Sequence, residues 1–396
     1  MMRSLSVVHL GKYYPPAPGG IETHVQALAR AQARLGAEVQ VLCVNHLDER
    51  GVDVTWSRTT RTRVRRERDQ GVELVRLARW GNAARLDICP GLGPLLLSAA
   101  RRADVLHLHV PNPTMMLPLL LLPPFARARW VVTHHSDVVR QRWLGRAIRP
   151  LEHAVYLRAD ALIATSPPYA ESSPLLSRHR RKVRVVPLGI DLAPFVEPSS
   201  AARREAERLV GTHGAPLWLV VGRLVYYKGI ATALEALRDV PGTLLVVGEG
   251  PLGDELRDQA ARLGVAERVV WLGHVSEAEL VGAYLAASAL WFSSNARSEA
   301  FGLAQVEAMA AGCPVINTSI PGSGVPWIAP GGSAALTVGV GDAVGLAAAA
   351  RRLLDDPRLR ARLVEAARAR ALAECSDRVA AERSLALYRE LLAASR

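Results

Sequence analysis

Short runs of apolar residues alternate along the chain with longer segments of helical periodicity. Residues 5–10, 39–44 and 103–110 are apolar runs of the length of a strand. Between the first two, residues 22–35 carry apolar side chains at three- and four-residue spacing and end before Gly36, a residue typical of helix C-termini. Strand, loop, helix and strand in this order predict a parallel sheet covered by helices.

The same alternation begins again in the second half of the chain. Residues 216–221, 244–247 and 269–273 predict strands, and residues 230–237 predict a helix after the first of them. Prolines and serines within 194–200 indicate a linker before this repeat.

The fold class expected is therefore α/β, with two doubly wound parallel-sheet domains. The domains are predicted at 1–190 and 195–375, and the helical residues 376–396 follow them. Two such domains imply a cleft between them, lined by loops at the carboxyl ends of the strands.

The segment 295–327 combines a loop, a helix and a short strand. Helical spacing begins at Leu303, and Gly312 is placed as the C-terminal stop. The amides of Phe301, Gly302 and Leu303 therefore lie at a helix N-terminus, which is suited to binding phosphate. Glu299 lies just outside this helix and Glu307 lies one turn inside it. Two glutamates at this spacing are also common as solvated surface charges.

Other candidates lie on loops that follow predicted strands. Gly19-Gly20 precedes a helix, where the chain either approaches a ligand closely or makes an ordinary tight turn. Arg223 and Lys228 follow a strand and precede a helix, as in a phosphate clamp, although surface charges give the same pattern. His134 and His135 end another strand. Their side chains point in opposite directions there, which suits metal chelation poorly.

These elements together resemble family 4 of the retaining nucleotide-sugar glycosyltransferases, which have the GT-B fold. The segment E299-AFGLAQV-E307 resembles the E-x7-E segment of that family, and VVPLGID at 185–191 resembles its interdomain junction. The Gly-Gly and Gly-Arg-x4-Lys elements occur in family order, so the resemblance covers nearly the whole chain. In the family, the final helix crosses back onto the first domain.

The resemblance implies a role for each candidate. Glu299 and His135 are expected beside the donor sugar as catalytic residues, although a slip of one residue to His134 is possible. Glu307 is expected to hold the ribose hydroxyls, and the amides at 301–303 to hold the diphosphate. The other donor-binding residues implied are Gly19, Gly20, Arg223, Lys228, Gly248, Glu249, Gly250 and Val275.

Composition and charge indicate the compartment of the protein and the surfaces that it binds. The four cysteines are scattered without a C-x-x-C pair, which favours a reducing compartment and disfavours a zinc site. No secretory signal or transmembrane run is expected. The net charge is +12, and residues 1–190 carry 28 Lys and Arg against 14 Asp and Glu. The arginine-rich segment 58–68 predicts one strand of a hairpin with a solvated face, and the apolar run 115–125 predicts a core helix or a surface for a lipid acceptor.

The function expected is transfer of a hexose from a nucleotide sugar to a hydroxyl of a lipid-linked or growing glycan. The segments RSEAFGLAQVEAMAAG and THHSDVVRQ resemble bacterial mannosyl- and rhamnosyltransferases, which favours a GDP-mannose-like donor over a UDP-hexose. No D-x-D occurs, so no cofactor and no obligatory divalent metal are expected. A cytoplasmic enzyme, peripheral at an anionic membrane and without a nucleic-acid partner, is predicted. The alternatives are a nucleotide-sugar 2-epimerase and a non-catalytic basic protein that binds membrane or nucleic acid.

Overall fold

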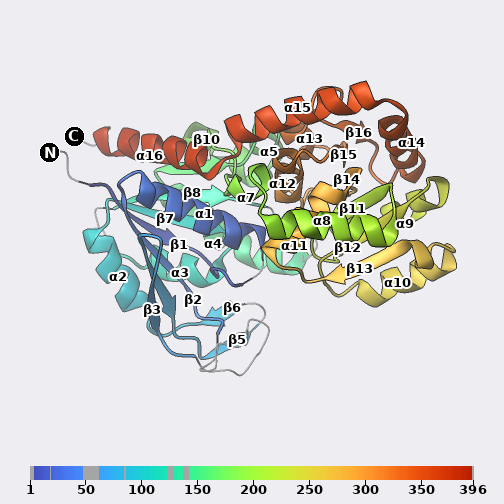
Figure 1. Cartoon of the computed structure of the whole chain (residues 1–396). Coiled ribbons are helices and arrows are strands. Elements are labelled where there is room, and N and C mark those ends of the chain that lie inside the picture. The colour runs from blue at the N-terminus through green and yellow to red at the C-terminus, as the bar shows by residue number, and fades with distance from the viewer. Residues whose placement is uncertain are drawn as a thin grey trace. The chain divides into compact units, whose positions relative to one another are not determined.

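The computed structural model describes residues 4–17, 19–47, 62–83, 86–123, 128–136 and 142–394 (Figure 1). The chain divides into two compact units. The first contains Met1–Ile190 together with Asp377–Arg396, and the second contains Asp191–Ser376. Each unit is built on a mainly parallel sheet with helices, which confirms the α/β class predicted from the alternating sequence pattern.

The main sheet of the first unit has the strand order β10-β9-β8-β7-β1-β2-β4-β3. All neighbours are parallel except β3 and β4, which form the predicted antiparallel hairpin. Residues 58–61 of the arginine-rich segment lie outside the described residues. The strands are β1 (Ser6–Leu10), β2 (Glu38–Val44), β3 (Arg65–Asp69), β4 (Val72–Leu77), β7 (Val105–Val110), β8 (Arg129–His134), β9 (Ala161–Ala164) and β10 (Val183–Val185). The order changes direction at β1, because β2 lies on one side of it and β7 on the other.

The core of the first unit is completed by residues from the end of the chain. Helix α16 (Asp377–Ala393) packs on α1 (Gly20–Arg34), with Leu28 and Ala31 of α1 against Ala380 and Ala381 of α16. Tyr388 of α16 is fully buried against the sheet. The other elements are β5 (Gly81–Ala83), β6 (Leu86–Ile88), α2 (Leu92–Arg102), α3 (Pro113–Leu120), α4 (Arg142–Arg158), α5 (Pro167–Ser172), α6 (Pro174–Ser177) and η1 (Arg180–Lys182).

The sheet of the second unit is parallel throughout, in the order β13-β12-β11-β14-β15-β16. Its strands are β11 (Leu217–Val221), β12 (Thr243–Val247), β13 (Val269–Gly273), β14 (Ala289–Phe292), β15 (Val315–Thr318) and β16 (Leu336–Val338). The two central strands meet through Trp218 and Trp291, whose stacked rings lie 5.0 Å apart in the core.

Helices surround this second sheet. They are α7 (Ala193–Val196), α8 (Ser200–His213), η2 (Tyr226–Lys228), α9 (Ile230–Ala236), η3 (Leu237–Asp239), α10 (Gly253–Arg262), η4 (Ala266–Arg268), α11 (Glu277–Ala286), α12 (Leu303–Ala311), α13 (Val325–Ile328), α14 (Ala343–Asp355) and α15 (Pro357–Glu374). The segment predicted as a linker contains most of α7 and the first residue of α8. The Ser199 hydroxyl accepts a hydrogen bond from the Ala202 amide and caps α8, so this serine begins a helix.

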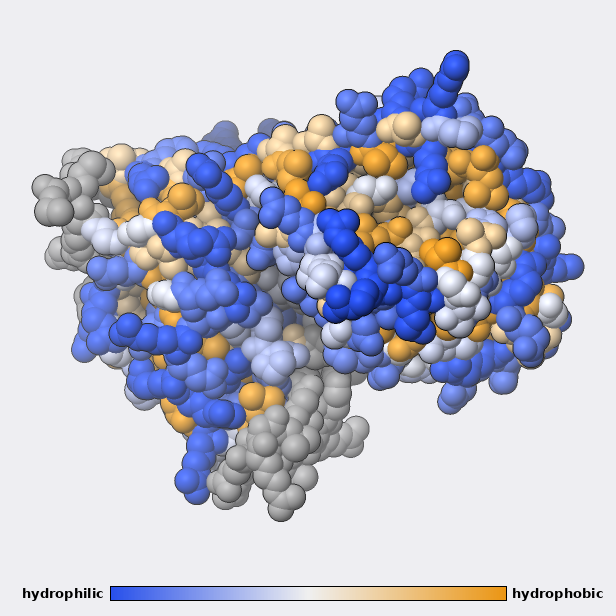
Figure 2. Space-filling model, in the orientation of Figure 1, coloured by the Kyte–Doolittle hydropathy of each residue, from blue (hydrophilic) through white to orange (hydrophobic). Residues whose placement is uncertain are grey.

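The apolar run at 115–125 forms part of α3 as far as residue 120, and residues 124–125 lie outside the described residues. Met115, Met116 and Leu119 are buried, as predicted for a core helix, whereas Leu117 and Leu121 are 55% and 74% exposed. The face of the molecule in Figure 2 is mostly hydrophilic, with apolar side chains scattered among charged ones. Among the described residues, no helix combines the length and the apolar character needed to cross a bilayer.

Candidate functional site

The sheet of the second unit changes direction between β11 and β14. Strands β12 and β13 lie on one side of β11, whereas β14 lies on the other. In open α/β sheets, ligands bind at the carboxyl ends of the strands where the strand order reverses. The loops at this position are 222–229 and 293–302, and they carry Arg223, Lys228 and Glu299.

Lys228 and Glu299 form an ion pair at this position. Lys228 Nζ lies 2.6 Å from Glu299 Oε2, and the two side chains are 14% and 12% exposed. Burial by itself lowers the pKa of Lys228, but the charge and the hydrogen bond of Glu299 oppose it, so the pKa is raised. The Ser294 hydroxyl donates to the same carboxylate oxygen at 3.3 Å. The lysine is therefore a fixed positive charge at neutral pH.

Close backbone packing fixes the position of Lys228. Gly222 and Gly248 have φ values of +140° and +118°, which residues other than glycine rarely adopt. A Cβ at Gly248 would lie 2.3 Å from the Gly222 carbonyl oxygen, and a Cβ at Gly222 would lie 2.8 Å from Lys228 Cε. The lysine stem therefore lies against a surface that only glycine provides.

The loop that carries Glu299 is held by side-chain hydrogen bonds to its carbonyl groups. The Ser323 hydroxyl donates to the Glu299 carbonyl at 2.5 Å, and Gln305 Nε2 donates to the Phe301 carbonyl at 2.9 Å. Asn317 Nδ2 in turn donates to Gln305 Oε1 at 3.2 Å. Because these partners are buried, the carboxylate is presented by a loop of defined geometry.

Helix α12 begins and ends at the positions predicted from the sequence. Gly302 precedes it with φ +84°, and a Cβ there would lie 2.7 Å from Phe292 Cζ. Gly312 ends it in the left-handed conformation. The amides of Phe301, Gly302 and Leu303 therefore lie at the positive end of the helix dipole, next to the loop of Glu299. This arrangement suits an anion.

Glu307 lies inside α12, one turn from its start. Its Oε2 accepts a hydrogen bond of 2.7 Å from the Tyr284 hydroxyl. Burial raises the pKa of Glu307, while the Tyr284 hydrogen bond and the Lys228 charge oppose the rise. Because Tyr284 occupies Oε2, the other oxygen has capacity to accept from a ligand.

The remaining candidates of the second unit lie on neighbouring loops at the same edge of the sheet. Arg223 follows β11 and is exposed, and Val275 lies after β13 and is half-buried. Gly248, Glu249 and Gly250 follow β12, and this loop is tied to both neighbours. The Gly248 amide donates to the carbonyl at the end of β13 at 2.7 Å, and the Glu249 carbonyl accepts from the loop after β11 at 3.0 Å.

In the first unit, Gly19 precedes α1 and Gly20 is its first residue. The Glu22 carboxylate covers this turn, since a Cβ at Gly19 would lie 2.1 Å from Glu22 Oε2. His135 follows β8 and is 5% exposed. The neighbouring His134 points to a different partner, with its Nδ1 2.6 Å from the Tyr156 hydroxyl.

His135 is a buried, neutral side chain with one polar atom unused. Burial lowers its pKa well below the ordinary value. Its Nε2 lies 3.0 Å from His109 Nδ1, and within the described residues its buried Nδ1 has no hydrogen-bond partner. An unsatisfied buried polar atom costs about 1–3 kcal/mol, so it indicates a place for a ligand or a water.

Two further residues at the carboxyl ends of the strands of the first unit were not predicted from the sequence. Asn112 follows β7 and Thr165 follows β9, the two neighbours of β8. Both are fully buried, and in the described part of the chain neither the Asn112 amide group nor Thr165 Oγ1 has a partner. Both lie within two residues of the end of an apolar strand, as His135 does, and this position is the signal that could have identified them.

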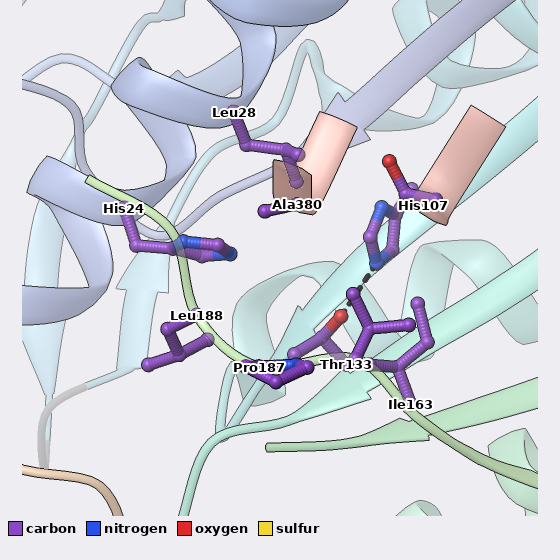
Figure 3. Close-up of a pocket in the computed structure, with 10 residues that line it drawn as sticks. His24, Leu28, His107, Thr133, Ile163, Pro187, Leu188 and Ala380 are labelled. Carbon is purple, nitrogen blue, oxygen red and sulfur yellow. Dashed lines mark hydrogen bonds between the residues drawn. The ribbon is translucent and has the colours of Figure 1, made fainter. Parts of the chain in front are cut away.

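A small cavity of about 10 Å³ in the first unit is lined by residues of α1, β7, β8 and α16, among others (Figure 3). His24 and His107 face it from opposite sides, and His107 Nε2 lies 2.7 Å from Thr133 Oγ1. The His24 Nδ1 lies 2.9 Å from the Gly189 carbonyl oxygen. The volume is close to the lower limit for one water molecule, so the cavity is part of the packing and too small for a sugar.

Comparisons with known proteins agree in both halves of the chain. The model of glycosyl transferases group 1 matches residues 203–370, and that of a glycosyl transferase 4-like domain matches residues 19–189. D-rhamnosyltransferase WbpZ of Pseudomonas aeruginosa is 35% identical over 258 residues, which are 65% of this chain and 66% of the relative.

Two other relatives align over more of their length. O-antigen chain mannosyltransferase C of Escherichia coli is 29% identical over 82% of each chain. Glycogen synthase of Mycobacterium tuberculosis is 33% identical over 90% of this chain and 88% of its own. Among solved structures, sucrose-phosphate synthase from Thermosynechococcus elongatus has a TM-score of 0.78 at 24% identity, covering 98% of this chain and 100% of that chain.

Proposed function

We propose that this chain, which belongs to the family of glycosyl transferases group 1 and has the GT-B fold, is a retaining hexosyltransferase. It moves a sugar from a nucleotide sugar to a hydroxyl of a glycan acceptor. The observation that carries the proposal is the Lys228–Glu299 pair where the strand order reverses, beside the start of α12. This position combines a fixed cation and a carboxylate with the amides at the start of a helix, the groups needed for a diphosphate and for sugar hydroxyls.

In the proposed reaction, Arg223, Lys228 and the amides at 301–303 bind the diphosphate. Glu307 accepts hydrogen bonds from ribose hydroxyls, and Glu299 and His135 position the donor sugar. The bond between the anomeric carbon and the phosphate oxygen breaks, and a bond to the acceptor oxygen forms on the same face. The acceptor proton passes to the leaving phosphate, so the anomeric configuration is retained without a covalent intermediate.

The proposed reaction needs no divalent metal and no cofactor. Negative charge grows on the diphosphate as the bond to the sugar breaks. Preorganised donors aimed at such charge contribute strongly to rate, and Lys228, Arg223 and the helix-start amides are donors of this kind. Turnover is therefore expected to persist in excess EDTA.

The donor proposed is GDP-mannose or a GDP-deoxyhexose. The names of the rhamnosyl- and mannosyltransferase relatives support this choice, and the acceptor proposed is a lipid-linked or growing glycan. A UDP-hexose is the second candidate.

A thermal-shift panel of GDP, UDP and ADP tests the donor base. A nucleotide at one hundred times its Kd stabilises the folded protein by about 2.7 kcal/mol, so the correct base raises the Tm well above the others. The Glu307→Gln variant serves as the control, because it removes a proposed ribose contact. Product formation is then followed with the sugar nucleotide of that base, with and without EDTA. A panel without any shift, or equal shifts in the Glu307 variant, would count against this site.

We further propose that the enzyme works in the cytoplasm at the inner face of the membrane. The support is the excess of arginine in residues 1–190, together with the exposed Leu117 on α3 and the exposed Leu121 directly after it. Basic residues close to an anionic leaflet contribute about 1 kcal/mol each.

A further inference from the structure

A row of hydrogen-bonded side chains crosses the first unit and ends at His135. Gln32 Oε1 lies 2.8 Å from His9 Nε2, and His9 Nδ1 lies 3.0 Å from His109 Nε2. His109 Nδ1 then lies 3.0 Å from His135 Nε2. Gln32 comes from α1, and the histidines come from β1, β7 and the end of β8, which are adjacent in the sheet. All four residues are buried.

The C-terminal helix fixes the direction of this row. The Ser384 hydroxyl on α16 donates to the Ala381 carbonyl at 3.0 Å, so its oxygen has only lone pairs to offer to other groups. Gln32 Nε2 lies 2.8 Å from that oxygen. The amide nitrogen of Gln32 therefore faces Ser384, and its carbonyl oxygen faces His9.

The position of Tyr388 agrees with this orientation. The Tyr388 hydroxyl lies 2.6 Å from His107 Nδ1 and 3.3 Å from Gln32 Nε2. An amide nitrogen can only donate, so between Gln32 and Tyr388 the hydroxyl oxygen is the acceptor, whichever way the hydrogen bond to His107 runs. This contact again places the nitrogen of Gln32 on the side of α16.

The polarity passes from ring to ring because each imidazole is neutral. Burial lowers the pKa of His9 to about 4 and the pKa values of His109 and His135 well below their ordinary value. A neutral imidazole has one N–H and one lone pair. Since Gln32 Oε1 can only accept, Nε2 of His9 donates, and its Nδ1 must accept from His109. By the same step, His135 donates through Nε2 and keeps a lone pair on Nδ1.

A metal ion would have to compete with this network. The ring nitrogens of His9, His107 and His109 include a set that lies within 4.8 Å of one another, as in a three-histidine site. However, all six ring nitrogens of these residues are within hydrogen-bond distance of a side chain. A bound metal would need a free lone pair from each ring and would break the row.

We propose that Gln32, His9 and His109 are positioning residues that hold His135 as its Nε2–H tautomer, so that Nδ1 accepts a hydrogen bond from a substrate hydroxyl. This proposal rests on the proposed function, in which His135 faces the donor sugar. It also gives α16 a role besides core packing. Ser384 and Tyr388 orient the Gln32 amide, and this orientation determines which way the hydrogen bonds of the row point. It also makes His135 a selective group, since an acceptor nitrogen favours a hydroxyl and gives nothing to a sugar that lacks it.

The first experiment tests the row without any substrate. Nitrogen NMR of the full-length, histidine-labelled protein distinguishes Nδ1–H from Nε2–H, and a His135→Asn variant assigns the His135 signals. In the unchanged protein, His9, His109 and His135 are expected as Nε2–H tautomers. In Gln32→Met, the acceptor is lost and His135 is expected to become a mixture. Gln32→Glu keeps an acceptor at this place and is expected to restore the single tautomer.

Gln26→Met is the matched control, because it makes the same change on the same helix. Gln26 contacts Asp69, which lies outside the row. An Nδ1–H tautomer at His135, or an unchanged His135 in Gln32→Met, would refute the proposal that this row sets the tautomer of His135. Loss of the His9 and His109 N–H signals on addition of Zn²⁺ would show that His9, His107 and His109 form a metal site. This result would also refute the proposed role of the row.

The second experiment tests whether the row of hydrogen-bonded side chains affects turnover. These rates are measured with the sugar nucleotide that the enzyme uses as donor. Gln32→Met is expected to lower kcat/KM by about threefold to tenfold, which corresponds to the loss of one ordinary hydrogen bond. Gln26→Met is expected to leave kcat/KM unchanged. Nucleoside diphosphate affinity is expected to stay the same in both. Among monodeoxy donors, one analogue should be rejected by the unchanged protein and rejected less by Gln32→Met. Equal discrimination in both proteins would refute the proposed hydroxyl contact while leaving the glycosyltransferase activity intact.

Discussion

Replacing Lys228 by methionine separates the two roles of the Lys228–Glu299 pair. The change removes a cation that lies 2.6 Å from Glu299 and leaves a carboxylate that is 12% exposed. Loss of one partner of a buried ion pair costs about 3–5 kcal/mol. The lower end applies here, because Ser294 still donates to the carboxylate. A loss of about 3 kcal/mol corresponds to a Tm lower by roughly 6–12 °C for a unit of this size.

The double variant Lys228→Met with Glu299→Gln removes both charges and tests whether the cost comes from the unpaired carboxylate. Its Tm is expected to recover most of the loss, since no buried charge is left without a partner. Turnover is expected to behave differently. If Lys228 also meets the charge of the leaving diphosphate, its loss costs about 3–4 kcal/mol in rate, which is roughly 100- to 1,000-fold in kcat. The double variant does not restore that cation.

The assay is differential scanning calorimetry together with initial rates at saturating donor. The ion pair Arg208–Glu205 on α8 gives a matched control, because it is also 2.6 Å long and lies in the same unit, but its arginine is 55% exposed. Arg208→Met is expected to change stability by less than about 1 kcal/mol and to leave turnover unchanged. Near-normal turnover in Lys228→Met, or recovery of turnover in the double variant, would refute the catalytic part of the reasoning.

Three further predictions concern other parts of the molecule. Glu307→Ala is expected to weaken nucleoside diphosphate binding about tenfold to a few hundredfold in calorimetry, because one or two charged hydrogen bonds are lost; unchanged affinity would remove Glu307 from the site. Burial lowers the pKa of His9 to about 4 and holds the pKa values of His109 and His135 well below the ordinary value, so the unfolded chain binds more protons below about pH 6.5. The stability of the first unit is thus fully present above that pH and falls below it, by up to about 1.4 kcal/mol per pH unit for each histidine, and a flat Tm between pH 7 and 5 would contradict this. Liposome co-sedimentation is expected to need anionic lipid, to fade with salt and to weaken when Arg63, Arg65 and Arg66 become glutamine; equal binding to neutral vesicles would exclude the membrane proposal.

Much of the fold follows from local patterns in the sequence. The apolar runs and the glycine stops predict β1, β2, β12 and β13 nearly to the residue, because buried parallel strands need continuous apolar side chains. The start of α8 was missed, since Pro198, Ser199 and Ser200 are turn residues as well as helix-start residues. Only the Ser199 cap decides between these interpretations, and it depends on the backbone conformation.

The site was predicted less completely, because its contacts depend on strand order. Lys228 and Glu299 are 71 positions apart, and they meet because β14 pairs with β11. Their loops were predictable, since every parallel strand ends at the same edge of its sheet, but nothing local shows which strands are neighbours.

The histidine row shows the same limit at the level of single atoms. His107 and His109 are two positions apart on one strand, so the sequence alone places them on one face of the sheet. Their partners depend on register: His9 is level with His107, yet its ring bonds to His109. The polarity of the row depends on Ser384, which is 375 positions from His9 and joins the network only because α16 packs on α1. A pattern of residues can therefore indicate which side chains lie at the site, whereas the tautomer that a side chain presents to its substrate is set by distant groups that only the folded topology brings together.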